Sequence, residues 1–180
     1  TATLRALMSG RIPDSIEPHD WARAGRQITG TLPLTGMGRL CQSLEDTTGE
    51  VEITLAGQVL AGGRPVLTGT AVCAASVRCQ RCLEPFVLRL EAPIRLGVLS
   101  HEGALAKLPA GYEPLICPAG QELSVAQLIE DELLLVLPDY PHHADGMCGI
   151  TAVPAQQAGE RRPFAALAPL RKNDPPGGHD

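Results

Sequence analysis

The sequence has few aromatic residues and no long apolar run. Only five of its 180 residues are aromatic, so a core has to be built from aliphatic side chains. The longest apolar block, LLLVL, stops at Pro138, well short of the roughly 18 residues that a membrane helix needs. The N-terminus also lacks the basic region and apolar stretch of a signal peptide. These absences predict a cytoplasmic protein that does not enter a membrane.

Several motifs of enzymes are missing as well. No GxGxxG follows a strand, no GxxxxGK[ST] is present, and no nucleophile elbow is visible. The adjacent carboxylates Glu130, Asp131 and Glu132 cannot all face one reacting atom, because successive helix residues point about 100° apart. They are typical of a solvated helix face. No motif in the sequence therefore requires the protein to be an enzyme.

Basic residues are absent from one long segment. Residues 111–148 contain seven acidic side chains and no Lys or Arg, whereas residues 64–95 contain five arginines against two glutamates. With a net charge of −5, this pattern predicts either a polarised surface for a partner or two segments that neutralise each other in the fold.

Alternating apolar residues predict a sheet. Val51, Ile53 and Leu55 share one face of a strand. Residues 65–79 and 84–99 read as two long partner strands, connected through the segment CQRCLEP. Residues 26–44 (RQITGTLPLTGMGRLCQSL) alternate and are interrupted by glycines, which predicts two further short strands. Strands followed by one helix indicate an α+β fold with a mainly antiparallel sheet that can curl toward a barrel.

One helix is predicted in the C-terminal half. Ser124 followed by Gln127 forms a capping-box pattern, apolar residues then recur at helical spacing, and Pro138 ends the run. Residues 1–150 are predicted to form a single domain. Residues 151–180 read as a linker and a mostly disordered tail with a Pro-Phe island at 162–170, in which Phe164 contacts either its own domain or a partner.

The spacing of the cysteines suggests a metal site, and two other interpretations of them stay open. Cys79 and Cys82 form a CxxC at a strand connection, and PHHADGMC after the helix supplies His143 and Cys148. Together they match the Cys₃His ligand set of a structural Zn²⁺ site. His142 competes with His143, and spacing does not separate them. The other interpretations are a redox pair, or two buried thiols at a hairpin turn with no cofactor.

Four stretches resemble one family in sequence order. They are CQRCLEPF (79–86), LPAGYEPL (108–115), LIEDELLLVLPDYPHH (128–143) with Cys148, and RPFAAL (162–167). This set resembles the YceD family, which is linked to accumulation of large-subunit ribosomal RNA. The resemblance implies a non-enzymatic ribosome-biogenesis factor for 23S rRNA. It also favours the metal site, because some relatives carry cysteines where His143 stands and near Cys148.

The charge pattern restricts the kinds of partner that we expect. A pI of about 5.5 and few aromatics argue against strong binding to bare RNA. We expect the acidic segment around Glu130, Asp131 and Glu132 to bind a basic ribosomal protein or assembly factor. Local contact of Arg78 and Arg81 with pre-rRNA is the second possibility, and no small-molecule substrate is expected. The alternative function is a zinc-dependent hydrolase or nuclease that acts on precursor rRNA.

Overall fold

The structure is a computed structural model that describes residues 8–9, 11–144 and 147–148. The predicted tail, including Phe164, lies outside these residues, so the domain division near residue 150 stays a prediction. Among the described helices, none has the length and apolar character that a membrane crossing requires.

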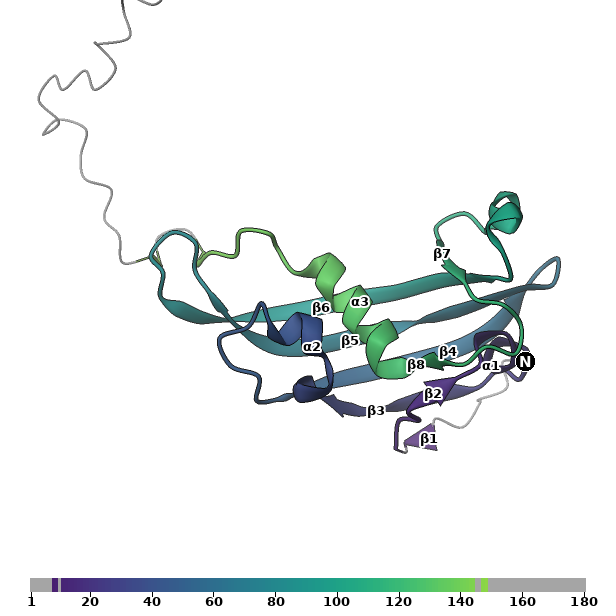
Figure 1. Cartoon of the computed structure of the whole chain (residues 1–180), viewed down its shortest axis with the longest axis horizontal. Coiled ribbons are helices and arrows are strands. Elements are labelled where there is room, and N and C mark those ends of the chain that lie inside the picture. The colour runs from purple at the N-terminus through teal and green to yellow at the C-terminus, as the bar shows by residue number, and fades with distance from the viewer. Residues whose placement is uncertain (1–7, 10, 145–146, 149–180) are drawn as a thin grey trace, which may run out of the picture. The chain divides into compact units, whose positions relative to one another are not determined.

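Six strands form one open sheet in the order β1-β3-β4-β5-β6-β7 (Figure 1). Their bounds are Met8–Ser9 (β1), Gln27–Pro33 (β3), Glu50–Leu60 (β4), Arg64–Arg78 (β5), Pro85–Leu99 (β6) and Glu113–Ile116 (β7). Ser15–Ile16 (β2) and Leu123–Ser124 (β8) form a separate two-stranded pair. The mainly antiparallel α+β class expected from the sequence is confirmed.

The sheet is open at both edges, whereas the sequence allowed a sheet that curls toward a barrel. The strands from β3 to β6 pair antiparallel, whereas β1 and β7 add in parallel at opposite edges. These edge strands contain two and four residues. A barrel requires its terminal strands to pair with each other along their length. The sheet therefore stays open, and the expected curling does not reach closure.

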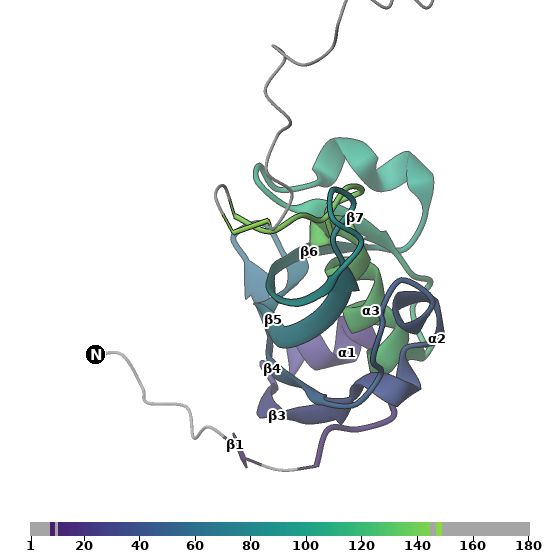
Figure 2. The same ribbon diagram turned by 90° about the vertical axis from the view of Figure 1, so that its left-hand side faces the viewer.

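The predicted helix is α3, Val125–Val136. The Ser124 hydroxyl accepts the backbone N–H of Gln127 at 3.4 Å, which caps the helix as predicted. Val125, Leu128, Ile129 and Leu133 are buried and join the core cluster with aliphatic residues of the sheet. Figure 2 shows α3 and α2 on the same side of the curved sheet.

Residues 34–41 are helical where a second short strand was expected. β3 is followed by a 3₁₀ turn, Leu34–Gly36 (η1), and by the short helix α2, Gly38–Cys41. Leu34, Met37 and Leu40 recur every three residues and are fully buried, a helical spacing that the intervening glycines obscured. A second 3₁₀ helix, Glu102–Lys107 (η2), lies in the expected loop, and α1, Pro18–Arg23, contains the expected helical turn at Trp21.

Candidate metal centre and acidic helix

The CxxC segment forms a tight connection between β5 and β6. The Cys79 N–H donates to the Glu84 carbonyl at 2.9 Å, and the Leu83 N–H donates to the Cys79 carbonyl at 2.9 Å. Leu83 adopts a left-handed backbone with φ of 64°, which is unusual for a residue with a side chain. The Arg81 N–H points at the Cys79 sulfur at 3.4 Å. The turn thus fixes the backbone of Cys79 and directs the Arg81 N–H at its sulfur.

The segment that follows α3 returns to this turn. The Gln80 N–H donates to the Pro141 carbonyl at 2.8 Å. Beyond this link, the Cys82 sulfur lies 3.4 Å from His143 Nδ1, and the sulfurs of Cys79 and Cys148 lie 3.7 Å apart. The ligand atoms of Cys79, Cys82, His143 and Cys148, here called the Cys₃His cluster, lie within 4.8 Å of one another. This cluster could hold a metal ion.

The spacing of the cluster fits a tetrahedral ion. Zinc binds thiolates at about 2.3 Å and imidazoles at about 2.0 Å, so tetrahedral ligands sit about 3.8 Å apart for two sulfurs and about 3.5 Å apart for sulfur and nitrogen. The 3.7 Å and 3.4 Å separations in this structure are close to those two values. The donors therefore suit Zn²⁺ in identity, and these two contacts match its tetrahedral separations, while all four ligand atoms lie within 4.8 Å of one another.

The electrostatics of the cluster differ between its cysteines. Burial raises the pKa of the Cys79 thiol, but backbone N–H groups of Cys82, His143 and Arg81 outweigh burial and lower that pKa to about 5. Burial and the neighbouring sulfurs of Cys82 and Cys79 raise the pKa of Cys148 to about 11. The site favours one thiolate and resists a second one unless a cation is added.

An aromatic side chain packs against the histidine of the cluster. The ring centroids of Phe86 and His143 lie 4.6 Å apart, with the rings tilted by 35°. The neighbouring His142 is exposed, and its Nδ1 lies 3.1 Å from the Tyr140 carbonyl. The structure thus brings His143 into the cluster and leaves His142 outside it, which the sequence alone did not separate.

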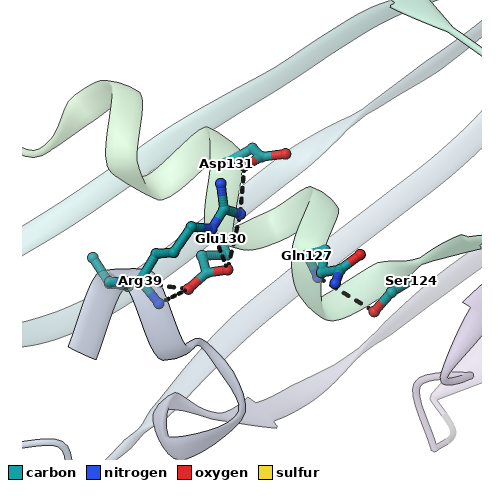
Figure 3. Close-up of polar contacts among 6 residues, drawn as sticks. Arg39, Ser124, Gln127, Glu130 and Asp131 are labelled. Atoms are coloured by element: carbon teal, nitrogen blue, oxygen red, sulfur yellow. Dashed lines mark hydrogen bonds and ion pairs between the residues drawn. The ribbon is translucent and has the colours of Figure 1, made fainter. Parts of the chain in front are cut away.

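The three acidic residues of α3 have different surroundings. Glu130 is buried, and its Oε1 accepts the backbone N–H groups of Arg39 at 2.6 Å and Leu40 at 3.0 Å (Figure 3). Its other oxygen, Oε2, accepts the Arg39 guanidinium at 2.9 Å, and that guanidinium also pairs with Asp131 at 2.6 Å. The carboxylate of Glu130 is thus engaged inside the protein.

A groove lies between α3 and the edge strand β7. It has a volume of about 350 Å³, and its acidic lining residues are Glu113, Asp131 and Glu132. Burial, followed by the charges of Glu113 and Asp131, raises the pKa of Glu132. Leu115, Leu128 and other aliphatic side chains complete the groove. The described lining residues include no Lys or Arg, so the groove is suited to a ligand that is both basic and apolar.

Of the two arginines expected to contact RNA, Arg78 is paired with a carboxylate of the same protein. The Arg78 guanidinium contacts both carboxylate oxygens of Glu45 at 2.8 Å. Arg81 is exposed at the CxxC turn. Phe164, the remaining residue of the expected binding set, lies outside the described residues.

A protein-family model described as "Large ribosomal RNA subunit accumulation protein YceD" matches residues 67–171, more than half of the chain. The chain belongs to the YceD family. A Haemophilus influenzae protein with the same description is 27% identical over 169 residues, which cover 90% of this chain and 97% of that protein. No solved structure matches the chain significantly.

The YceD-matched region contains all of the Cys₃His cluster and α3. The four cluster residues are recognisable from the sequence, but no sequence pattern assigns a role to Phe86 or Arg39. The position of Phe86 at the start of β6, four residues after Cys82, was the available signal. For Arg39, 91 residues separate it from Glu130, and no local pattern links the two.

Proposed function

We propose that this YceD-family protein supports the accumulation of 23S ribosomal RNA as a non-enzymatic assembly factor of the large subunit, acting in the cytoplasm. The family match over residues 67–171 carries this proposal. The near full-length similarity to a relative named for large ribosomal RNA subunit accumulation supports it further.

The partner that suits the surface best is a basic ribosomal protein or assembly factor. The groove between β7 and α3 places Glu113 and Glu132 near each other beside aliphatic side chains. Burial first, and then the charges of Glu113 and Asp131, disfavour the charged form of Glu132. A Lys or Arg side chain from a partner would stabilise that charged form. Direct contact with pre-rRNA is the second candidate, and the engagement of Arg78 by Glu45 makes it less favoured.

Zn²⁺ is the proposed cofactor, held in the Cys₃His cluster as a structural ion. A zinc hydrolase or nuclease would need an open ligand position and a nearby general base. The cluster supplies four protein donors, and Glu130 is engaged by Arg39 and Leu40. These features favour a binding protein over the hydrolytic alternative.

The cellular role is tested by depleting the protein and measuring the ratio of large- to small-subunit rRNA, with precursor ends mapped in the same samples. A selective fall in the large-subunit RNA is expected. An unchanged ratio with normal ends would refute the proposed role. Cleavage of precursor rRNA by the purified protein, lost in an Asp131→Asn variant that still folds, would instead favour the nuclease.

The partner is tested with the purified chain and basic large-subunit proteins. Binding should weaken steeply with salt and should fall in the double variant Glu113→Gln, Glu132→Gln, which leaves the pairing of Arg39 intact. Glu50→Gln is the matched control, since Glu50 is exposed at the start of β4 and does not line the groove. Binding to rRNA fragments, with no binding to any basic protein, would reject this partner class.

A further inference from the structure

The Cys₃His cluster joins two distant parts of the chain. Cys79 and Cys82 lie in the β5–β6 connection, whereas His143 and Cys148 follow α3, and the two contacting pairs are 69 and 61 residues apart in sequence. None of the four residues belongs to the main hydrophobic cluster of the described core. The contacts between the four cluster residues are therefore sulfur–sulfur and sulfur–nitrogen contacts beside the core.

We propose that the Cys₃His cluster is a closed Zn²⁺ clip and that Phe86 selects His143 over His142 as its nitrogen ligand. The inference rests on the Zn²⁺ part of the proposed function and is independent of the rRNA role. In this arrangement the ion fastens the segment after α3 to the β5–β6 turn, and so fixes where the chain leaves the acidic helix.

The donor set and its protein surroundings favour Zn²⁺ in a structural role. Three thiolates and one imidazole are soft or borderline ligands that suit Zn²⁺, whereas Mg²⁺ and Ca²⁺ require oxygen ligands. Four protein ligands fill a tetrahedron and leave no position for a reacting water. The turn already supplies backbone donors to one sulfur, through the Arg81 N–H at 3.4 Å from Cys79. Hydrogen bonds of this kind orient and stabilise a metal-bound thiolate.

Phe86 explains why one of two adjacent histidines joins the cluster. Phe86 pairs with Val77 in the ladder between β5 and β6, so the backbone beneath its ring is fixed by the sheet. Its ring packs at 4.6 Å against His143, whose Nδ1 lies 3.4 Å from the Cys82 sulfur. Stacking restricts the imidazole to one orientation before an ion arrives, and less ordering is then required on binding. His142 has no such aromatic contact among the described residues.

The clip is tested by metal titration of the full chain. The purified protein is stripped with a chelator, titrated with Co²⁺ to record the absorption of a tetrahedral thiolate site, and then with Zn²⁺ in competition to obtain affinity. One ion per chain is expected. His143→Ala should weaken Co²⁺ and Zn²⁺ affinity at least about 10-fold and shift the Co²⁺ spectrum, because three thiolates and a water can still surround the ion. His142→Ala should leave the affinity within about twofold. Phe86→Ala should weaken affinity about 10- to 100-fold, the usual range for residues that orient metal ligands.

A second variant, Phe86→Leu, and unfolding of the metal-free protein distinguish orientation of His143 by Phe86 from a general effect of Phe86 on stability. Phe86 also packs against the core, so Phe86→Leu keeps an apolar side chain there while removing the flat ring. Phe86→Leu should bind Zn²⁺ more weakly than the unchanged chain. The free energy of unfolding of its metal-free form should stay close to that of the unchanged chain. Full Zn²⁺ affinity in both Phe86 variants, or equal losses in the two histidine variants, would overturn the selection by Phe86. Failure of the unchanged chain to bind Co²⁺ or Zn²⁺ would overturn the clip, and the rRNA ratio would still decide the cellular role.

Discussion

Glu130 on α3 holds Arg39 at both its backbone and its side chain. Oε1 accepts the Arg39 backbone N–H at 2.6 Å, and Oε2 accepts the guanidinium at 2.9 Å. The same Oε1 accepts the Leu40 N–H. These backbone groups belong to the first turn of α2, whose N–H groups have no partners within the helix. A carboxylate from a distant helix therefore caps α2 and anchors it to α3.

Removing this carboxylate should destabilise the fold. Hydrogen bonds to a charged group contribute about 1.5–3 kcal/mol each, and a buried donor left unpaired costs a comparable amount. We expect Glu130→Ala to lower the free energy of unfolding by about 3 kcal/mol, measured by urea denaturation at neutral pH. The adjacent Glu132→Gln is the control and should unfold at or slightly above the urea concentration of the unchanged chain. Equal stability of Glu130→Ala and the unchanged protein would contradict the capping role.

Acid should remove the contribution of Glu130. Burial raises its pKa, but the backbone N–H of Leu40 and the side chain and backbone of Arg39 outweigh burial and lower it below its ordinary value of 4.5. A carboxyl with a lowered folded pKa stabilises the protein fully above the unfolded pKa and progressively less as pH falls through the folded pKa. The stability gap between the unchanged chain and Glu130→Gln should thus be constant near neutrality and shrink below about pH 4.5.

Glu132 should show the opposite dependence on pH. Its pKa is raised by burial, with smaller effects from Glu113 and Asp131. Ionisation of such a group costs stability as pH rises above its unfolded pKa. Glu132→Gln should therefore gain stability over the unchanged chain as pH rises from about 4 toward neutrality. Urea unfolding across this range measures the difference in free energy of unfolding between the two proteins. A difference that grows as pH falls would contradict the raised pKa of Glu132.

Zinc should protect three specific thiols from alkylation. Cys79, Cys82 and Cys148 belong to the cluster, while Cys41 is partly exposed and outside it. In the zinc-loaded native protein we expect Cys41 to react with iodoacetamide and the cluster thiols to resist. Chelation should make the cluster thiols reactive, whereas buried Cys73 and Cys117 should stay unmodified until unfolding. Mass spectrometry of peptides measures alkylation at each cysteine. Equal alkylation of the cluster thiols with and without zinc would contradict the Zn²⁺ clip.

Gly57 should be intolerant of any side chain. A Cβ at this position would lie 2.6 Å from the Trp21 carbonyl oxygen and 2.7 Å from the Trp21 ring. α1 therefore packs on β4 only because Gly57 leaves room. Gly57→Ala should destabilise by about 1–3 kcal/mol through overpacking. Gly36→Ala is the control, since nothing lies within 4 Å of its added Cβ. Thermal unfolding of both variants gives the comparison, and equal midpoints would argue against close packing of α1.

Local patterns in the sequence predicted the elements whose cause is local. Alternation at Val51, Ile53 and Leu55 predicted β4, and the capping pattern of Ser124 with helical spacing up to Pro138 predicted α3. Each of these signals depends on residues within a few positions of one another. The expected second strand within residues 34–41 was wrong, because glycines beside the buried Leu34, Met37 and Leu40 hid the helical spacing.

The tertiary structure alone decided which distant residues meet. The sequence supplied Cys79, Cys82 and two candidate histidines, but Phe86 and the returning segment after α3 placed His143 in the cluster and His142 in solvent. It also supplied three consecutive acidic residues on a helix, while contact with α2 buried Glu130 and left Asp131 exposed. Local periodicity carries no information about which turn of a helix another element covers. That choice is made by chain reversals and side-chain packing between segments far apart in sequence.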